Sequence, residues 1–170
     1  SRPFYHSSSI MGLEPINQQI YLEFANRHLA KAGKEISDEA FSYLYQRFDG
    51  ITWYIQYVLN MLYTSLSDES ILHEDDVRHC IDSILAQQRF AHQALLFQLT
   101  SRQKQVLTAI AKENETASLM SQEFLHKYRL GASTVQGAVK TLLDRDFITH
   151  DNGVYRLCDK FLEYTLREDE

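Results

Sequence analysis

The stretch from Ser121 to Leu157 places the tightest constraint on what this chain can fold into. It contains two short segments in which apolar residues recur at helical spacing, separated by Gly131. The first segment carries Phe124, Leu125 and Tyr128, and the second carries Val135, Ala138, Val139, Leu142 and Leu143. Ser121 is a natural N-cap, and Ser133 with Gln136 has the spacing of a capping box. We therefore expect two short helices, with Gly131 as the left-handed residue of the turn between them.

A tight hairpin follows the second helix at once. Asp151-Asn152-Gly153 lies between Phe147-Ile148-Thr149 and Val154-Tyr155-Arg156, and Asn-Gly is a strong signal for a two-residue turn. A capping box from Thr100 to Gln103 opens a helix before the pair, and Asp159 is a natural cap for one after the hairpin. Three helices, a hairpin and a last helix in this order predict a winged helix-turn-helix domain over residues 99–170.

Residues 17–98 predict a compact bundle of four helices, so the fold class is mainly α. The expected helices begin at Asn17, Ser37, Thr52 and His73, and Gly33 and Gly50 are expected to end the first two. The apolar stripe of the third helix is Ile55, Leu59, Leu62 and Leu66, and the fourth is expected to continue to Leu96. The boundary between the bundle and the winged helix is expected at Gln98–Thr100.

Residues 1–16 have a different character. The run from Ile10 to Leu13 predicts a short strand that ends before Pro15, and no partner strand is expected in the bundle that follows. The chain also begins without an initiator Met. We therefore expect residues 1–16 to be the end of a preceding domain and a linker.

The composition is that of an ordinary soluble protein, with 44% hydrophobic and 24% charged residues. No apolar run approaches the ~20 residues that span a membrane, and the start has no signal-peptide pattern. The two cysteines, Cys80 and Cys158, fit a reducing compartment. These features predict a cytoplasmic location and no membrane partner.

Catalytic chemistry is absent from the sequence motifs. The chain has no Gly-rich phosphate loop followed by Lys-Ser/Thr and no Cys-x-x-Cys pair. Its seven histidines show no metal-ligand spacing, and the acidic run Glu74-Asp75-Asp76 fits the positive end of a helix dipole. We expect no catalytic residue, no metal site and no enzymatic activity.

The second helix of the pair is where a winged helix would read DNA. The candidate contact residues on it are Ser133, Thr134, Gln136 and Lys140, joined by Arg156 from the hairpin. However, residues 99–170 carry ten Lys and Arg against 11 Asp and Glu, a net charge of −1. Because nonspecific DNA affinity depends on Lys and Arg neutralising phosphates, this balance weighs against DNA and leaves a protein partner as the other candidate.

Aromatic residues gather on the second and third helices of the bundle. Tyr54 and Tyr57 lie off the apolar stripe of the third helix. Such rings either complete the bundle core or form a contact surface for a missing domain or an adenine base.

Several short motifs occur in a familiar order: Arg2-Pro3-Phe4-Tyr5, Met11-Gly12-Leu13-Glu14-Pro15-Ile16, Gly50-Ile51-Thr52, Leu99-Thr100, Gly131-Ala132-Ser133-Thr134-Val135 and Tyr155-Arg156-Leu157-Cys158-Asp159. Together they resemble the carboxy-terminal part of P-loop ATPases of the AAA+/STAND group, particularly the archaeal ATPase-like family. The resemblance implies that residues 17–98 are an ATPase lid and that Gly50, Thr52 and Tyr54 approach the nucleotide, with Thr52 standing where the family has proline. It also makes Arg47 and Arg2 candidates for a sensor arginine.

Two functions follow as hypotheses. In the first, the chain is a non-catalytic regulatory fragment that holds no cofactor itself, while ATP and magnesium belong to the parent, whose ATPase core would precede Ser1. The lid would sense nucleotide, and the winged helix would relay its state to a protein or DNA partner. In the second, the chain is a DNA-binding transcription regulator. A winged helix used only for protein docking or self-assembly is a third possibility, and its mark would be an apolar patch on the recognition-helix face, which the sequence does not plainly show.

Overall fold

The computed structural model describes residues 14–65 and 71–168. Its contacts divide the chain into two compact units, Ser1–Ile81 and Asp82–Glu170. The division falls inside helix α4 (Glu74–Phe97), whereas the sequence placed a boundary at Gln98–Thr100, just beyond the end of that helix. The expected strand at residues 10–13, the motif at residues 2–5 and the candidate Arg2 all lie outside the described residues.

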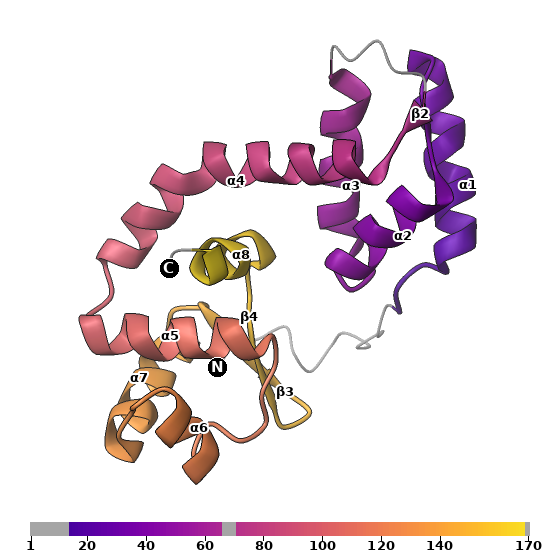
Figure 1. Cartoon of the computed structure of the whole chain (residues 1–170). Helices are drawn as coiled ribbons and strands as arrows, with labels where there is room; N and C mark the ends of the chain where they lie inside the picture. The colour runs from indigo at the N-terminus through magenta and orange to yellow at the C-terminus, as the bar shows by residue number, and fades with distance from the viewer. Residues whose placement is uncertain (1–13, 66–70, 169–170) are drawn as a thin grey trace, which may run out of the picture. The chain divides into compact units, whose positions relative to one another are not determined.

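The first unit begins with helix α1 (Gln18–Leu29), as the sequence predicted (Figure 1). The side chain of Asn17 caps it by accepting from the backbone N–H groups of Gln19 and Ile20 at 3.0 and 3.3 Å. A turn of 3₁₀ helix, η1 (Ala30–Ala32), follows and ends at Gly33, whose φ of 71° is left-handed. The predicted cap residue and stop residue are both confirmed.

Helices α2 (Asp38–Arg47) and α3 (Thr52–Thr64) complete the bundle around an aromatic core. Ser37 caps α2 as predicted, but the N-cap of α3 is Ile51, so Thr52 is its first helical residue rather than its cap. The left-handed residue that ends α2 is Asp49, at φ 52°, and Gly50 follows it in the same region. Tyr21 and Phe41 pack edge to face in the core with ring centroids 5.5 Å apart.

A two-stranded parallel sheet in the first unit was not predicted. Its strands are β1 (Glu35–Ile36) and β2 (Ile71–Leu72), with Glu35 opposite Ile71 and Ile36 opposite Leu72. Two residues per strand are too few to show an alternating pattern. The expectation that this region is entirely helical is therefore wrong.

Lys34, immediately before β1, is buried and binds the C-terminal end of α3. Its Nζ donates to the carbonyl oxygens of Leu62 and Ser65 at 2.9 and 2.6 Å and to the Ser65 hydroxyl at 2.8 Å. An ammonium group at this end satisfies carbonyls that have no partner within the helix and complements the negative end of its dipole.

The second unit contains the end of α4 and helices α5 (Ser101–Glu113), α6 (Gln122–Lys127), α7 (Ala132–Asp144) and α8 (Lys160–Glu168) (Figure 1). Helix α4 reaches Phe97, in line with the expected continuation to Leu96. The predicted capping box of α5 is confirmed, since Thr100 and Gln103 bond to each other's backbone N–H at 3.3 and 2.9 Å. Helices α5 and α7 contribute more residues to the core than any other element, and the core also includes Leu119, Phe124, Leu157, Leu162 and Leu166.

The turn between α6 and α7 differs from the prediction. Ser121 caps α6 as expected, but the left-handed residue of the turn is Arg129, with φ 52°. Leu130 N–H then bonds back to the carbonyl of Leu125 at 2.9 Å, and Arg129 N–H to that of His126, which is the Schellman pattern. Gly131 has φ −86° and is the N-cap of α7, so the expected capping box from Ser133 to Gln136 is not formed.

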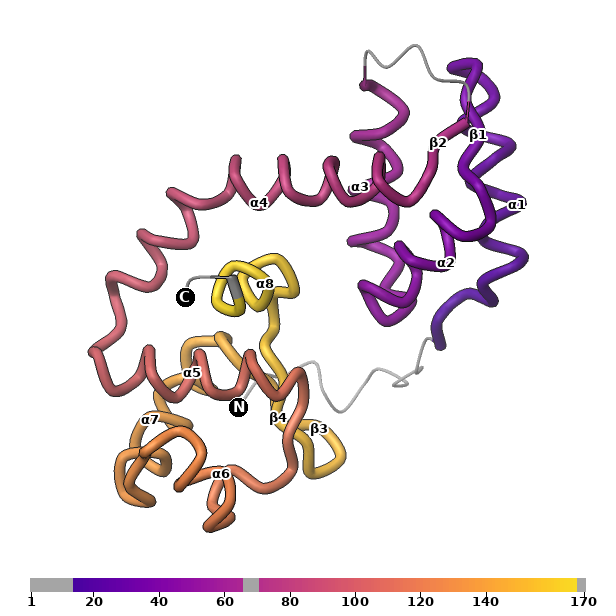
Figure 2. Tube along the Cα trace, viewed as in Figure 1, coloured from indigo at the N-terminus to yellow at the C-terminus, as the bar shows by residue number. Residues whose placement is uncertain are grey.

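The predicted hairpin is confirmed as β3 (Ile148–Asp151) and β4 (Val154–Leu157), which Figure 2 shows as one antiparallel ribbon. Asp151 pairs with Val154, so the loop is Asn152-Gly153, and both residues have positive φ as a type I′ turn requires. On the other side of β4, Thr116 and Tyr155 exchange backbone hydrogen bonds of 3.1 and 2.8 Å. The fold is therefore mainly helical, with a helical region followed by a winged helix.

Candidate functional site

The outer face of α7 presents the residues that the sequence singled out. Ser133, Gln136 and Lys140 are exposed, and Thr134 is partly buried. Ser133, Gln136 and Lys140 follow the i, i+3, i+7 pattern and so share one side of the helix, whereas Thr134 lies about 100° around from Ser133. Lys140 is the one lysine or arginine of this helix. The structure thus brings three of the five predicted DNA contacts together on one exposed side but supplies a single positive charge among them.

The fifth predicted contact, Arg156 on β4, is already engaged. Its Nε donates to the Glu115 carboxylate at 2.7 Å, and its NH2 nitrogen lies at the same distance from that oxygen. Glu115 belongs to the loop after α5, so this ion pair crosses from the wing to that loop. A carboxylate at this distance offsets the charge that Arg156 would bring to a phosphate.

A second exposed ion pair engages Lys127, beside the helix-turn-helix. Lys127, at the end of α6, donates to Glu113 at 2.6 Å, and the Tyr128 hydroxyl donates to the same carboxylate oxygen at 2.6 Å. These two hydrogen bonds lower the pKa of Glu113, the Lys127 bond being the larger cause. Glu113 is consequently a stable anion beside α6.

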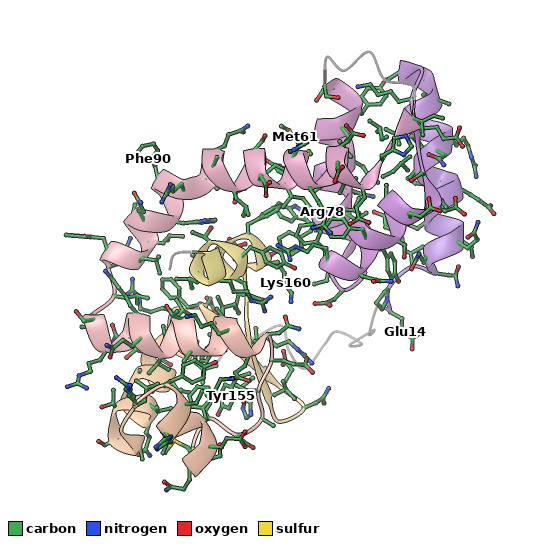
Figure 3. All side chains as sticks on the ribbon, in the orientation of Figure 1. Glu14, Met61, Arg78, Phe90, Tyr155 and Lys160 are labelled. Atoms are coloured by element: carbon green, nitrogen blue, oxygen red, sulfur yellow. The ribbon has the colours of Figure 1, made fainter. Side chains whose placement is uncertain are left out.

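An apolar groove of about 500 Å³ lies between α7, the loop before α6 and the wing. From α7 it is lined by Val135, Gln136 and Val139, and from the wing by Tyr155, which Figure 3 labels. Residues 117–121 form the remaining wall, where Leu119 is buried and Met120 is 49% exposed. Sequence periodicity did not reveal this groove because residues 117–121 have no regular secondary structure.

Tyr155 connects the groove wall to the wing. Its backbone pairs with Thr116, which sets the start of the 117–121 wall, and its ring stacks on His150 across the hairpin at a centroid distance of 4.0 Å. Both sides of this residue are therefore fixed: the backbone by the extra strand pairing and the ring by a cross-strand neighbour. The groove wall that Tyr155 forms is accordingly preformed.

Buried polar contacts fix α8 against the rest of the second unit. Glu163 is fully buried and forms ion pairs with Lys160, at 3.3 Å, and with Arg167. Arg167 also donates to the Ala111 carbonyl at 2.7 Å, and both cations reach the Asn114 side chain at the end of α5. Figure 3 labels Lys160 at the start of α8.

His92 makes a polar contact between α4 and α8. Its Nδ1 lies 2.8 Å from the Thr165 hydroxyl, and its Nε2 lies 3.9 Å from the Asp159 carboxylate. Burial lowers the pKa of His92, and the nearby Asp159 charge opposes that shift without reversing it. The imidazole is therefore neutral near pH 7.

The residues expected to approach a nucleotide occupy the interior of the first unit or its turns. Tyr54 is buried, and its ring stacks on that of Phe48 with centroids 5.3 Å apart and an angle of 7° between the ring planes. The prediction that Tyr54 lies off the apolar stripe of its helix is therefore wrong. Gly50 is buried too, and a Cβ there would lie 2.8 Å from Tyr45 and Pro15. The Thr52 carbonyl accepts from the Tyr21 hydroxyl at 3.3 Å. Arg47 lies in the last turn of α2.

A smaller concavity of about 310 Å³ lies between α1 and α3. Phe24 and His28 line it from α1, and Leu59 and Tyr63 from α3. None of the three predicted nucleotide contacts lines this concavity or the groove beside α7. Gly50, Thr52 and Tyr54 are close in sequence, but none of them lies in the wall of either hollow.

Two kinds of site are missing from the part of the chain that the structure describes. Within residues 14–65 and 71–168, no cluster of three or more His, Cys, Asp or Glu side chains has an arrangement that could hold a metal ion. No helix in these ranges has the length and apolar character needed to span a bilayer.

Comparison with known proteins bears on the second unit. No curated protein and no solved structure matches the chain. Residues 90–168 match the model of one protein family, which is described as a probable winged helix domain. Nothing in these comparisons connects the chain with a P-loop ATPase. With helices α5 to α7, the β3–β4 wing and α8 in the order given above, residues 90–168 are a winged helix domain.

Proposed function

We propose that the winged helix is a protein-binding module and that a partner protein occupies the groove beside α7. The observation that carries this proposal is the groove itself, which three separate segments line with apolar side chains. Val135 and Val139 come from α7, Leu119 and Met120 from the loop, and Tyr155 from the wing. Val135 and Leu119 are themselves buried, so the apolar surface open to a partner comes from Met120, Val139 and Tyr155. Concave sites lined mainly by apolar side chains are the usual places where proteins bind other molecules.

The charge of the surrounding surface supports protein over DNA. A DNA-binding surface gains most of its affinity from Lys and Arg that displace counterions from phosphates. Here Arg156 is paired with Glu115 and Lys127 with Glu113, which leaves Lys140 as the cation of α7. Aromatic and Met residues with few charges are, in contrast, typical of the centre of a protein interface.

DNA binding is the second candidate, and a specific observation favours it. Ser133, Gln136 and Lys140 are exposed on the helix that a winged helix inserts into the major groove. Gln136 has the amide group that pairs with an adenine edge, and Lys140 could contact guanine or phosphate.

The wider setting that we propose is the one implied by the resemblance to AAA+/STAND ATPases. The chain would be a non-catalytic, cytoplasmic regulatory module whose helical unit responds to ATP and magnesium in a separate ATPase core and whose winged helix relays that state. The support for this setting is the order of sequence motifs described above. A Gly-x-x-x-x-Gly-Lys-Ser/Thr loop encoded upstream of Ser1 is its direct test, and its absence would remove the ATPase parent without affecting the groove.

Two variants of equal charge separate the two candidate functions. Met120→Glu places a carboxylate in the groove, whereas Ser133→Glu places one on the exposed face of α7 outside the groove lining. A photo-crosslinking residue at position 120 in the native cells would identify the partner, whose affinity for each purified variant is then measured by calorimetry. We expect Met120→Glu to weaken binding at least tenfold and Ser133→Glu to leave it nearly unchanged.

The DNA candidate makes the opposite prediction for the same two proteins. Binding of a labelled duplex that weakens between 50 and 200 mM salt, and is lost in Ser133→Glu and Lys140→Glu but kept in Met120→Glu, would overturn the protein-docking proposal. Circular dichroism of each variant confirms that the winged helix is intact.

A further inference from the structure

The last three turns of α4 carry an apolar face that no described residue covers. Phe90 and Phe97 are 83% and 85% exposed, and Leu95 is 40% exposed. Phe90, Ala94 and Phe97 follow the i, i+4, i+7 pattern, so they share one side of the helix. Figure 3 labels Phe90 on α4. Two phenylalanine side chains so fully exposed on one helix face are unusual for a surface that meets only water.

The opposite side of the same helix packs within the second unit. His92, two residues after Phe90 and therefore about 200° around the helix, is 3% exposed and contacts Thr165 of α8. Helix α4 is thus joined to α8 at His92, on the side of the helix away from Phe90.

The exposed face combines large and small apolar residues and carries no charge. Ala86 and Ala94 lie within about 40° of Phe90 around the helix, Gln87 and Gln93 lie about 60° to either side, and all four are exposed. Between Ser83 and Phe97 the one Lys, Arg, Asp or Glu is Arg89, which lies about 100° from Phe90 on the helix. The face therefore offers two aromatic projections next to alanine positions that leave room for them.

We propose that this face pairs with the same face of a second copy of the chain, α4 against α4. In a twofold dimer the same surface patch faces itself, so it must be self-complementary. Each protruding side chain needs a recess on the other copy, and a charged residue near the axis would face the same charge. Phe90 and Phe97 of one copy would pack over the alanines of the other, and the uncharged surface brings no like charges together. The winged helix domains of the two copies would be carried along by their contacts with α4.

The length of the face sets the strength of the pairing. Residues 86–97 span roughly 18 Å of helix at 1.5 Å per residue. Two helices in contact over this length bury less than the ~1,200 Å² that marks the lower end of stable interfaces, so we expect a reversible dimer. The dissociation constant should therefore fall in the micromolar range and change little with salt. The fraction of dimer should rise with protein concentration.

Sedimentation velocity of the whole 170-residue chain from 1 to 300 μM tests this proposal. We expect the sedimentation coefficient to rise with concentration, and Phe90→Ser and Phe97→Ser each to weaken the association at least tenfold. Ile20→Ser is the matched control, because Ile20 is 64% exposed on α1 of the other unit and should leave the dissociation constant unchanged. A chain that stays monomeric at every concentration, or a dimer that Phe90→Ser does not weaken, would overturn the proposal.

A charge-exchange experiment locates the twofold contact itself. Ala94 lies near the centre of the face between Phe90 and Phe97, so the two copies of residue 94 lie close together whether the helices run parallel or antiparallel. Ala94→Glu and Ala94→Lys should each give monomers, and an equimolar mixture should restore association. Failure of the mixture to associate, when both variants retain the wild-type circular dichroism spectrum, would refute pairing through this face.

Discussion

The buried carboxylate of Glu163 permits a quantitative test of how α8 is held in the winged helix. Glu163 is completely buried and lies between Lys160 and Arg167, whose side chains are 7% and 28% exposed. Glu163→Gln keeps the shape and removes the charge. It leaves two cations at the junction of α8 with the end of α5 without their carboxylate.

The expected cost follows from the burial of the three groups. Removing one partner of a buried ion pair typically costs about 3–5 kcal/mol, because the remaining charge stays desolvated. Arg167 is partly exposed and keeps its bond to the Ala111 carbonyl, so we expect the lower end, about 3 kcal/mol. The exposed pair Lys127–Glu113 supplies the control, since Glu113→Gln makes the same chemical change where solvent screens the charges and should cost under about 1 kcal/mol.

Urea unfolding followed by far-ultraviolet circular dichroism measures both variants. The midpoint should fall clearly for Glu163→Gln with an unchanged slope, and only slightly for Glu113→Gln. Equal losses in the two variants, or a loss below about 1 kcal/mol for Glu163→Gln, would show that burial of this network does not determine its contribution.

Two further predictions concern pH and backbone conformation. Burial holds the pKa of His92 below the ordinary value of about 6.5, so the folded state disfavours the protonated imidazole. The neutral His92 side chain therefore contributes its full stability above pH ~6.5, and this contribution is lost as the pH falls toward the folded pKa. The free energy of unfolding should therefore decrease from pH 7.5 to 5.5 in wild type and change less in His92→Gln; a wild type that gains stability on acidification would contradict the assignment. Arg129 and Gly153 both have positive φ, so Arg129→Gly should raise the free energy of unfolding by roughly 0.5–1 kcal/mol and Gly153→Ala should lower it by about 1 kcal/mol. Gly131→Ala, at φ −86° with Thr134 Oγ1 no closer than 3.7 Å to the added Cβ, should be tolerated, and a large loss there would contradict the turn described here.

The elements with strong local signals were predictable from the sequence. Asn17, Ser37, Thr100, Ser121 and Asp159 each cap the helix that they were expected to cap, and Asn152-Gly153 forms the expected turn. In these cases one side chain or one dipeptide satisfies backbone groups a few residues away, so the sequence itself contains the whole interaction.

The turn before α7 shows where such local reasoning is insufficient. Glycine is the residue that best tolerates positive φ, which made Gly131 the natural choice for the left-handed position. In the structure Arg129 adopts that conformation, because the bonds from Leu130 to Leu125 and from Arg129 to His126 end α6 two residues earlier. Asp49 and Asp146 end α2 and α7 with positive φ in the same way. Local backbone hydrogen bonds at these helix ends thus place non-glycine residues in the left-handed region, where a preference scale does not expect them.

The candidate site depends on contacts that connect distant parts of the sequence. The exposure of Ser133, Gln136 and Lys140 on α7 follows from helical periodicity alone. The ion pair of Arg156 with Glu115 and the pairing of Tyr155 with Thr116 each join residues about 40 positions apart, and periodicity carries no information about them. Tyr54 is buried through a nearer contact, because its ring stacks on Phe48, the C-cap residue of α2, and the periodicity of α3 carries no information about that partner.

The contact between Lys34 and the end of α3 also determines where the first unit can accept additional residues. Ser65 is held by the Lys34 ammonium, and Ile71 is held by its pairing with Glu35, the next residue along the chain. The two ends of the segment from Ser65 to Ile71 are therefore anchored by neighbouring residues, independently of what lies between them. Loop-closure entropy rises slowly with length, by about 0.6 kcal/mol for each doubling, so residues added between two fixed ends cost little. A fluorescent or affinity label inserted here would leave the bundle folded and both proposed binding surfaces unaltered.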